Sequence, residues 1–186
     1  MAEEKPRIFQ GAKDITLSLG IIVILMVAMM ATSGLCSFNQ DRKGQPVTVA
    51  DAGTFITMES RTTAFPVRLP VVPEDWTCTV ARRVQVAEEF APLLGYVTKD
   101  SHYVQLVQSS QPADSIFELI DDKLRERSGN TTIAGHEVEI YTGDEPMWVT
   151  TTDDGVTLAV SGLASEEQFA QLMEAALAAS PVVINQ

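Results

Sequence analysis

Residues 95–109 read GYVTKDSHYVQLVQS, and residues 147–161 read MWVTTTDDGVTLAVS. Each stretch contains two runs rich in β-branched or aromatic residues, and a polar turn separates the two runs. This pattern predicts a β-hairpin in each stretch. The two predicted hairpins decide the fold that we expect for the C-terminal part of the chain.

The two hairpin segments resemble each other at a constant spacing of 52 residues, and a helix is predicted to follow each of them. The repeat predicts an α+β domain with an antiparallel sheet built from two strand–strand–helix repeats, its helices packed on one face. A convergent choice of hairpin and helix residues is the alternative to a true repeat. Identical residues occur at Val97/Val149, Thr98/Thr150, Val104/Val156, Leu106/Leu158, Ser109/Ser161 and Phe117/Phe169.

Local signals place the ends of the two helices and the remaining elements. Ser165 and Gln168 have the spacing of a capping box, which predicts the start of the last helix. Pro112 is expected to open the helix of the first repeat and Gly129 to end it. Further predicted segments are a helix at 47–60, an extended stretch at 65–74, a strand at 76–81, a turn or short helix at 84–94, and one strand at 132–142.

The N-terminal part of the chain has a different composition. Between Asp14 and Asp41, 26 consecutive positions carry no charge, and residues 15–38 are mostly Leu, Ile, Val, Met, Ala and Gly. Because ~20 residues of helix cross the roughly 30 Å core of a bilayer, this composition predicts a transmembrane helix over residues 15–38. Its length favours a retained anchor, since the apolar core of a signal peptide is shorter; cleavage before Gly34 is the alternative.

The charges beside the apolar stretch predict its orientation. Three basic residues precede it and two follow it closely, so the excess of positive charge lies on the N-terminal side. Positive charge stays in the cytoplasm, which predicts a cytoplasmic tail at residues 1–14. We accordingly expect a linker at 39–46 and an extracytoplasmic α+β domain at 47–186, held at the plasma membrane by a single pass.

The formal net charge of −12 belongs to the predicted outer part of the chain. Residues 41–186 contain 10 Lys and Arg against 22 Asp and Glu, whereas residues 1–40 sum to zero. Affinity for nucleic acid depends on Lys and Arg that neutralise phosphates, so we expect no nucleic-acid partner. The acidic surface is expected either to keep the domain soluble beside a membrane of like charge or to face a basic partner.

Two cysteines are present, Cys36 at the end of the apolar stretch and Cys78 in a predicted strand. Lipidation of Cys36 would require a small residue immediately before it, where Leu35 stands. A disulfide between the two cysteines would require the domain to fold back onto the membrane surface. Free and mostly buried thiols are the expected state, with lipidation and pairing as alternatives.

The sequence contains no recognisable set of catalytic, cofactor-binding or metal-binding residues. His102 and His136 are the only histidines, and they lack the helical or paired-cysteine spacing of a zinc site. No phosphate-binding loop, dinucleotide-binding loop or nucleophile elbow occurs. We expect a protein that is not an enzyme and needs no cofactor. Trp76 and Trp148 are candidates for a pair of ligand-binding residues beside an apolar groove, with core packing as the alternative.

The order of these parts resembles a known family. The residues that carry the resemblance are Leu69-Pro70, Glu74-Asp75-Trp76, Gly95-Tyr96-Val97-Thr98 and Trp148 with the stretch at 154–162. They look like an uncharacterised family of actinobacterial envelope proteins known only as a domain of unknown function. The resemblance covers the anchor and nearly all of the outer domain. It implies an actinobacterial plasma membrane with the domain facing the cell wall, and it carries over no catalytic residue.

Together these features predict a non-enzymatic membrane protein that works by contact. Its partners are expected to be the lipid bilayer, through residues 15–38, and a membrane protein. The first hypothesis is an accessory or assembly subunit of a larger membrane complex, with the respiratory chain as an example. The alternative is a cell-envelope carrier or sensor domain that binds a lipid or a cell-wall fragment.

Overall fold

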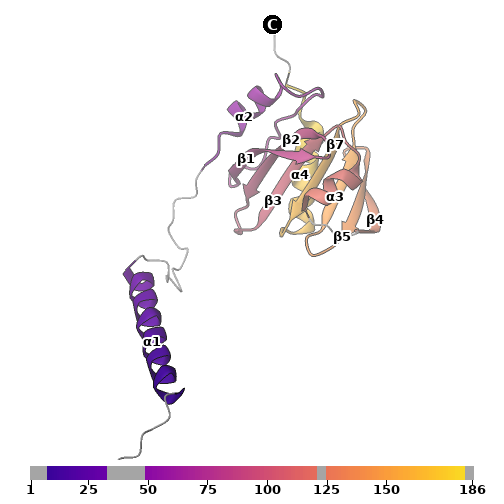
Figure 1. Ribbon diagram of the computed structural model, residues 1–186. Helices are drawn as coiled ribbons and strands as arrows, with labels where there is room; N and C mark the ends of the chain where they lie inside the picture. The colour runs from indigo at the N-terminus through magenta and orange to yellow at the C-terminus, as the bar shows by residue number, and fades with distance from the viewer. Residues whose placement is uncertain (1–7, 33–48, 121–124, 183–186) are drawn as a thin grey trace, which may run out of the picture. The chain divides into compact units, whose positions relative to one another are not determined.

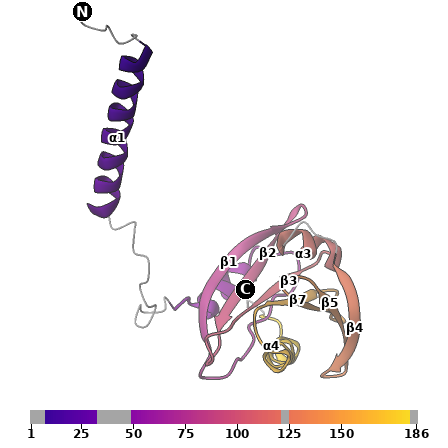
Figure 2. The same cartoon turned by 90° about the horizontal axis from the view of Figure 1, so that it is seen from below.

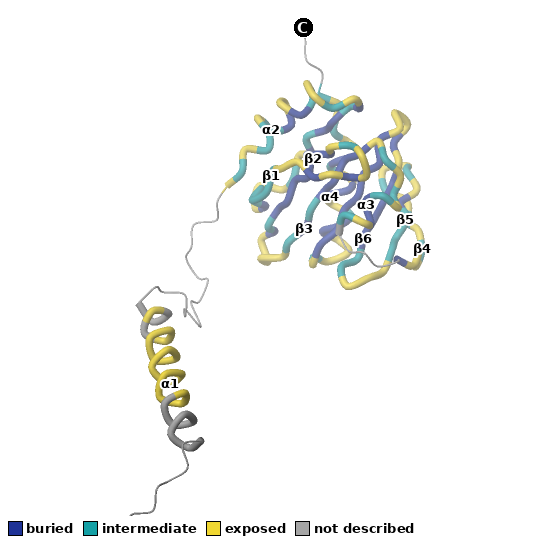
Figure 3. The backbone as a smooth tube through the Cα atoms, in the orientation of Figure 1, coloured by how far each residue is buried: buried dark blue, intermediate teal, exposed yellow. Residues whose placement is uncertain are grey.

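The computed structural model describes residues 8–32, 49–120 and 125–182, and the chain divides into two units, Met1–Pro46 and Val47–Gln186 (Figure 1). In the first unit, helix α1 (Ile8–Thr32) exposes the large apolar side chains at positions 15–27 and at Met29 (Figure 3). Over the described part of the chain, no helix meets the length and apolarity that a membrane span requires. Positions 33–38 of the predicted span and the predicted linker at 39–46 lie outside the described residues.

The second unit contains an antiparallel sheet of seven strands, which confirms the predicted α+β class. The strands lie in the order β1-β2-β3-β7-β6-β5-β4, and every neighbouring pair is antiparallel. Strands β3 and β7 therefore meet at the centre of the sheet, and the first three strands lie on one side of this junction. The strands are β1 (Thr77–Val86), β2 (Glu89–Val97), β3 (Tyr103–Ser109), β4 (Glu126–Ile133), β5 (His136–Thr142), β6 (Met147–Thr151) and β7 (Thr157–Gly162).

The two predicted hairpins are confirmed as β2–β3 and β6–β7, and two further hairpins correct the sequence prediction. The segment 84–94 is a turn between long strands, because β1 runs to Val86 and β2 begins at Glu89. The segment 132–142 is two strands, since Ile133 pairs with His136 across Ala134-Gly135. Both loop residues have positive φ, +48° and +85°, as a two-residue type I′ turn requires.

Two helices follow the central hairpins, α3 (Ala113–Ile120) and α4 (Glu166–Ala178), and they pack on opposite faces of the sheet. Figure 2 shows α4 inside the curve of the sheet. Side chains alternate along a strand, so neighbouring Leu93 and Leu94 reach different cores: Leu93 packs with α3 and Leu94 with α4. The expectation that both helices lie on one face is therefore wrong.

The core of each face combines strand and helix residues. The face covered by α4 has the larger core, and it also receives Phe65, Val67 and Trp76 from the segment before β1. Four apolar residues on one side of α4 are all buried, at Phe169, Leu172, Met173 and Ala176. The core under α3 contains Val84, Val86, Ala91, Leu93, Val107, Ile116, Phe117, Met147, Val149 and Ala159.

The path out of each hairpin explains why the two helices separate. Three residues connect β3 to α3, and three connect β7 to α4. The chain leaves β7 through Gly162, whose φ of +138° is rarely adopted by a residue with a side chain. Ser109, the last residue of β3, has no such backbone angle. The two connections of equal length consequently start in different directions.

The internal repeat is confirmed in its order of elements but not in its constant spacing. The hairpin turns match at 54 residues: Thr98 N–H donates to the His102 carbonyl at 2.9 Å, and Thr152 N–H donates to the Val156 carbonyl at 2.9 Å. The helices begin 53 residues apart. Phe117 is thus the fifth residue of α3 and Phe169 the fourth of α4. At about 100° per residue, this offset turns the two rings to different sides of their helices.

Helix α2 (Ala52–Glu59) packs on the same core as α4 through the fully buried Ile56, and the segment after α2 joins that core. The Asp51 side chain accepts the Thr54 N–H at 2.9 Å and caps α2, so the helix predicted at 47–60 begins at Ala52. Further along, the Arg68 guanidinium pairs with Asp154 at 2.5 Å, and its backbone N–H donates to the Gln108 amide oxygen at 2.8 Å. The Arg68 side chain is 9% exposed, so this pairing fixes the segment against the β6–β7 turn.

Candidate functional site

The two tryptophans proposed as ligand-binding residues lie in the core on the α4 face. Trp76 is 8% exposed and its ring centroid lies 6.4 Å from that of Tyr96. Trp148 is 7% exposed and its ring centroid lies 5.7 Å from that of Phe169. The structure therefore assigns both rings to packing between the sheet and its covering elements. The lining of the two pockets considered below includes neither ring.

The Cys78 thiol and the His102 imidazole have separate surroundings. Cys78 is a free, partly buried thiol that donates to the Val80 carbonyl at 3.4 Å, and burial raises its pKa. A raised pKa disfavours the thiolate, which is the nucleophilic form. His102 places Nδ1 3.1 Å from the Gln168 amide oxygen, beside the start of α4. Cys36 lies outside the described residues.

The carboxylate of Asp154 in the β6–β7 turn has a structural partner, and the described residues form no metal-binding cluster. Among residues 8–32, 49–120 and 125–182, no group of three or more His, Cys, Asp or Glu side chains is placed to hold a metal ion. Asp154, in the Asp153-Asp154-Gly155 turn, pairs with Arg68 and accepts a hydrogen bond from the Thr152 hydroxyl at 2.5 Å. This carboxylate is therefore part of the attachment of the segment before β1.

One pocket of about 240 Å³ lies beside α3, along β5 and β6. Its carboxylates, Glu137 and Glu139, both pair with Arg127, at 3.4 Å and 3.0 Å. The Tyr141 hydroxyl donates to Glu139 at 2.7 Å, and burial followed by this hydrogen bond raises the pKa of Tyr141 to about 12. These contacts engage both carboxylates with side chains of the same surface.

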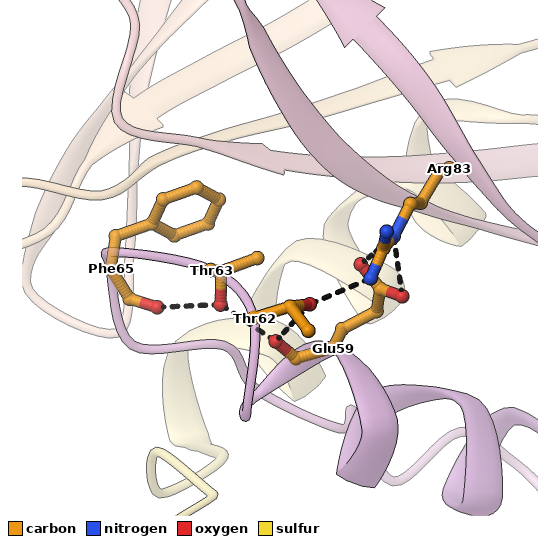
Figure 4. A network of polar contacts seen from close by, with 5 residues as sticks. All are labelled: Glu59, Thr62, Thr63, Phe65 and Arg83. Atoms are coloured by element: carbon orange, nitrogen blue, oxygen red, sulfur yellow. Dashed lines mark hydrogen bonds and ion pairs between the residues drawn. The ribbon is translucent and has the colours of Figure 1, made fainter.

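A second pocket lies between the end of α2 and the β1–β2 hairpin, and we call it the acidic groove. It has a volume of about 280 Å³. One wall is the C-terminal end of α2 with the turn behind it, and the other is the tip of the hairpin. An ion pair between Glu59 of α2 and Arg83 of β1 belongs to the lining (Figure 4). The residues that line the acidic groove are Glu59, Thr62, Thr63, Ala64, Arg83, Glu88, Glu89 and Phe90.

The ion pair in the lining of the acidic groove joins a buried carboxylate to a partly exposed guanidinium. Arg83 Nε lies 2.8 Å from both carboxylate oxygens of Glu59, and the two side chains are 44% and 4% exposed. Arg83 also donates from a terminal nitrogen to the Thr62 hydroxyl at 2.6 Å. The hydrogen bond and charge of Glu59 raise the pKa of Arg83. Arg83 therefore stays positively charged, and its charge is paired with the Glu59 carboxylate.

The turn after α2 is shaped by threonines that close the helix. The Glu59 carbonyl accepts the backbone N–H groups of Thr62 and Thr63, each at 2.9 Å. The Thr63 hydroxyl lies 3.0 Å from the same carbonyl and 3.1 Å from that of Phe65 (Figure 4). The Phe65 ring is buried in the core, which fixes the far end of the turn. This wall is thus a hydrogen-bonded helix end that is anchored in the core.

The opposite wall adds two carboxylates and an aromatic ring. Glu88 is exposed at the hairpin tip, and Glu89 accepts hydrogen bonds from the Ser110 hydroxyl and, at 3.2 Å, from the Gln111 amide. Both donors to Glu89 are neutral, so they orient its carboxylate without cancelling its charge. Phe90 is 58% exposed. With three carboxylates and one guanidinium in its lining, the acidic groove has a formal net charge of −2.

The acidic groove could not be predicted from the sequence, because its two walls are far apart in the chain. Glu59 and Arg83 are separated by 24 residues, and the sequence around neither residue predicts their pairing. The available signal was the Glu88-Glu89-Phe90 stretch, where acidic residues and an aromatic ring fall at the tip of a hairpin. The prediction of a turn or short helix there obscured that placement.

The comparisons with known proteins identify a family. A family model described as "Protein of unknown function (DUF4245)" matches residues 7–176. No curated protein and no solved structure matches the chain. The match confirms the expectation, drawn from the resemblance above, of a family defined by a domain of unknown function.

Proposed function

The chain belongs to the DUF4245 family, and we propose that it is a single-pass membrane protein, not an enzyme, whose acidic outer domain binds another protein of a membrane complex. In this proposal residues 15–38 cross the plasma membrane of an actinobacterium, residues 1–14 stay in the cytoplasm and residues 47–186 lie outside. The chain then acts as an accessory or assembly subunit, for which a respiratory complex is one candidate setting.

The observation that carries the proposal is the apolar surface of α1. Five consecutive residues, Ile21–Leu25, are each 50–69% exposed. Successive helical residues are about 100° apart, so five of them surround the helix completely. A helix that is apolar on all sides requires a surrounding apolar medium, either a protein core or lipid. The 26 uncharged positions around it match the length that a bilayer needs.

The charge of the second unit supports its role as an interaction domain. The net charge of the chain lies entirely within residues 41–186, because the basic and acidic residues of positions 1–40 balance. An acidic domain is repelled by anionic lipid headgroups and therefore stands away from the membrane surface. The acidic groove offers that domain a concave surface lined by both charged and aromatic side chains.

Extraction from membranes tests the anchor. The full chain is expected to stay in the membrane fraction at alkaline pH, whereas Val23→Arg/Ile24→Arg is expected in the soluble fraction, because each arginine at the centre of a span costs about 2.5–3.5 kcal/mol. The matched control, Val23→Leu/Ile24→Leu, should behave as the unchanged chain. Release of the unchanged chain by alkaline washing would overturn the anchor.

Native mass spectrometry of the full chain in a mild detergent tests the complex. We expect the chain to leave the membrane with at least one other membrane protein in a fixed ratio. A strictly monomeric chain, or one that carries only a lipid or a cell-wall fragment, would count against the accessory-subunit proposal. The second outcome would favour the carrier or sensor alternative.

A further inference from the structure

We propose that the acidic groove holds a lysine or arginine side chain from an extended segment of the partner protein. This inference rests on the proposed function, because it specifies the chemistry of the partner that the outer domain binds. It goes further in naming the docking surface, which lies between α2 and the β1–β2 hairpin.

The charges of the acidic groove select a cation. Arg83 is the one basic residue in the lining, and its Nε is committed to both oxygens of Glu59 at 2.8 Å. The lining contains no second basic residue to pair with the remaining carboxylates, Glu88 and Glu89. A cationic side chain entering from outside would therefore complete the charge balance that the groove lacks, while an anion would meet a net charge of −2.

The α2 end adds to this selection. The lining residues Glu59, Thr62 and Thr63 lie at the C-terminal end of the helix, where the aligned peptide dipoles leave partial negative charge. The contribution of such an end to binding a cation is modest, but it has the same sign as the carboxylates. Both walls of the groove consequently favour positive charge.

Phe90 explains why a long basic side chain fits better than a small inorganic cation. Its ring is 58% exposed on the groove wall, an unusual position for a large apolar side chain within an acidic lining. Lysine and arginine combine an apolar stem with a cationic head, so the stem can pack on the ring while the head reaches the carboxylates. A volume of about 280 Å³ is at the lower limit of small-molecule pockets and suits a single side chain.

A peptide titration tests this inference on the full chain in neutral detergent. The probe is a fluorescent octapeptide of alternating arginine and glycine, and the control peptide has glutamine in place of arginine. We expect saturable binding of the arginine peptide alone, weakened by salt. Glu88→Gln/Glu89→Gln should weaken it about tenfold, because two charge contacts are lost, and Phe90→Ala should weaken it about threefold.

The matched control for charge is Glu166→Gln/Glu167→Gln, which removes two adjacent carboxylates from the exposed start of α4. This variant should bind the arginine peptide as tightly as the unchanged chain. Equal weakening in both double variants would mean that the peptide binds the overall acidic surface, and the proposal would be wrong. Absence of saturable binding at millimolar peptide would also overturn it. Unchanged unfolding temperatures establish that the variants are folded.

The native complex separates failure of the groove from failure of the proposed function. Glu88→Gln/Glu89→Gln should lose the partner that the unchanged chain retains in mild detergent, whereas Glu166→Gln/Glu167→Gln should keep it. If the groove variant keeps the partner at full ratio, the docking surface is wrong and the accessory role stands. If the unchanged chain is monomeric, the accessory role falls, and the peptide titration alone decides whether the groove binds basic side chains.

Discussion

The two repeats, β2–β3–α3 and β6–β7–α4, have the same order of elements, the same type of hairpin turn and connections of equal length. Their helices nevertheless cover opposite faces of one sheet. The second helix is also longer, with 13 residues against 8. The comparison teaches that a strand–strand–helix order does not determine the face on which the helix packs. That choice depends on how the chain leaves the second strand.

The two helices also differ in how firmly they are held. The capping box of α4 is formed in both directions, since Ser165 accepts the Gln168 N–H and the Gln168 side chain accepts the Ser165 N–H. The Gln168 amide also donates to the Thr98 hydroxyl at 3.2 Å, which connects α4 to the β2–β3 turn. We therefore expect substitutions in the repeat β6–β7–α4 to have the larger effects on stability.

The largest expected effect comes from the two phenylalanines. Phe169→Ala should lower the free energy of unfolding by about 4 kcal/mol, because the side chain is 1% exposed in the larger core. Phe117→Ala should cost less, about 2–3 kcal/mol, since Phe117 is 8% exposed under a short helix. Denaturant unfolding of the full chain in detergent measures both. Equal losses would show that the two faces contribute alike.

Gly162 tests the origin of the divergence between the two units. A Cβ at this position would lie 2.4 Å from the Tyr103 carbonyl oxygen, and its φ of +138° disfavours any side chain. Gly162→Ala should therefore cost about 3 kcal/mol and disturb the start of α4. Gly129→Ala, in β4, has nothing within 4 Å of the added Cβ and serves as the control. An unfolding midpoint for Gly162→Ala as high as that of the control would contradict this role.

The aspartates of the two hairpin turns have different partners and should differ in effect. Asp154→Asn should cost about 2 kcal/mol, because it leaves the Arg68 guanidinium with 9% exposure and no anionic partner; one third of Asp154 is solvated, which moderates the loss. Asp100→Asn should change stability by less than about 0.5 kcal/mol, since Asp100 only accepts a long hydrogen bond from Gln168 at 3.4 Å. Thermal unfolding of both variants measures the difference.

Asp154 also predicts a pH dependence. Burial alone would raise its pKa, but hydrogen bonds from Thr152 and Arg68 and the charge of Arg68 outweigh burial and lower the pKa below 3.8. The folded state then releases this proton more readily than the unfolded state, so stability falls as pH drops below about 4. The Asp154→Asn variant should lose that part of the acid sensitivity, and Asp100→Asn should keep it.

A smaller effect is expected at the N-cap of α4. Ser165→Ala removes the acceptor for the Gln168 N–H and should cost about 1 kcal/mol. Ser165→Asp keeps an acceptor oxygen at the helix N-terminus and should retain most of the stability. Chemical denaturation compares the two. If both variants lose the same amount, the hydroxyl contributes through something other than capping.

The smallest expected effect lies in the turns themselves. Ser101 and Gly155 occupy the same position in the two turns, with φ of +63° and +77°. Ser101→Gly should therefore stabilise by about 0.5 kcal/mol, and Gly155→Ser should destabilise by about 1 kcal/mol. The opposite signs, measured as shifts in thermal midpoint, test whether the two turns share one geometry.

Local patterns predicted much of this fold and little of the candidate site. The hairpins at 95–109 and 147–161 and the capping box at Ser165 depend on neighbours within a few residues, and the structure confirms them. The segment at 84–94 was harder, because Glu88 and Glu89 fit a helix as well as a hairpin tip. The Glu59–Arg83 pair depends on a contact between α2 and β1, which no local pattern encodes.

By itself the sequence determined the uncharged N-terminal stretch, the acidic composition of the rest and the runs of β-branched and aromatic residues that became strands, because hydropathy and charge are properties of residues and of their immediate spacing. Only the tertiary structure decided that α3 and α4 cover opposite faces, that Arg68 is fixed by Asp154, and that the acidic groove exists. Each of these features depends on backbone direction at one residue or on side chains brought together from distant positions. The contacts that stabilise these features form only once the sheet has formed.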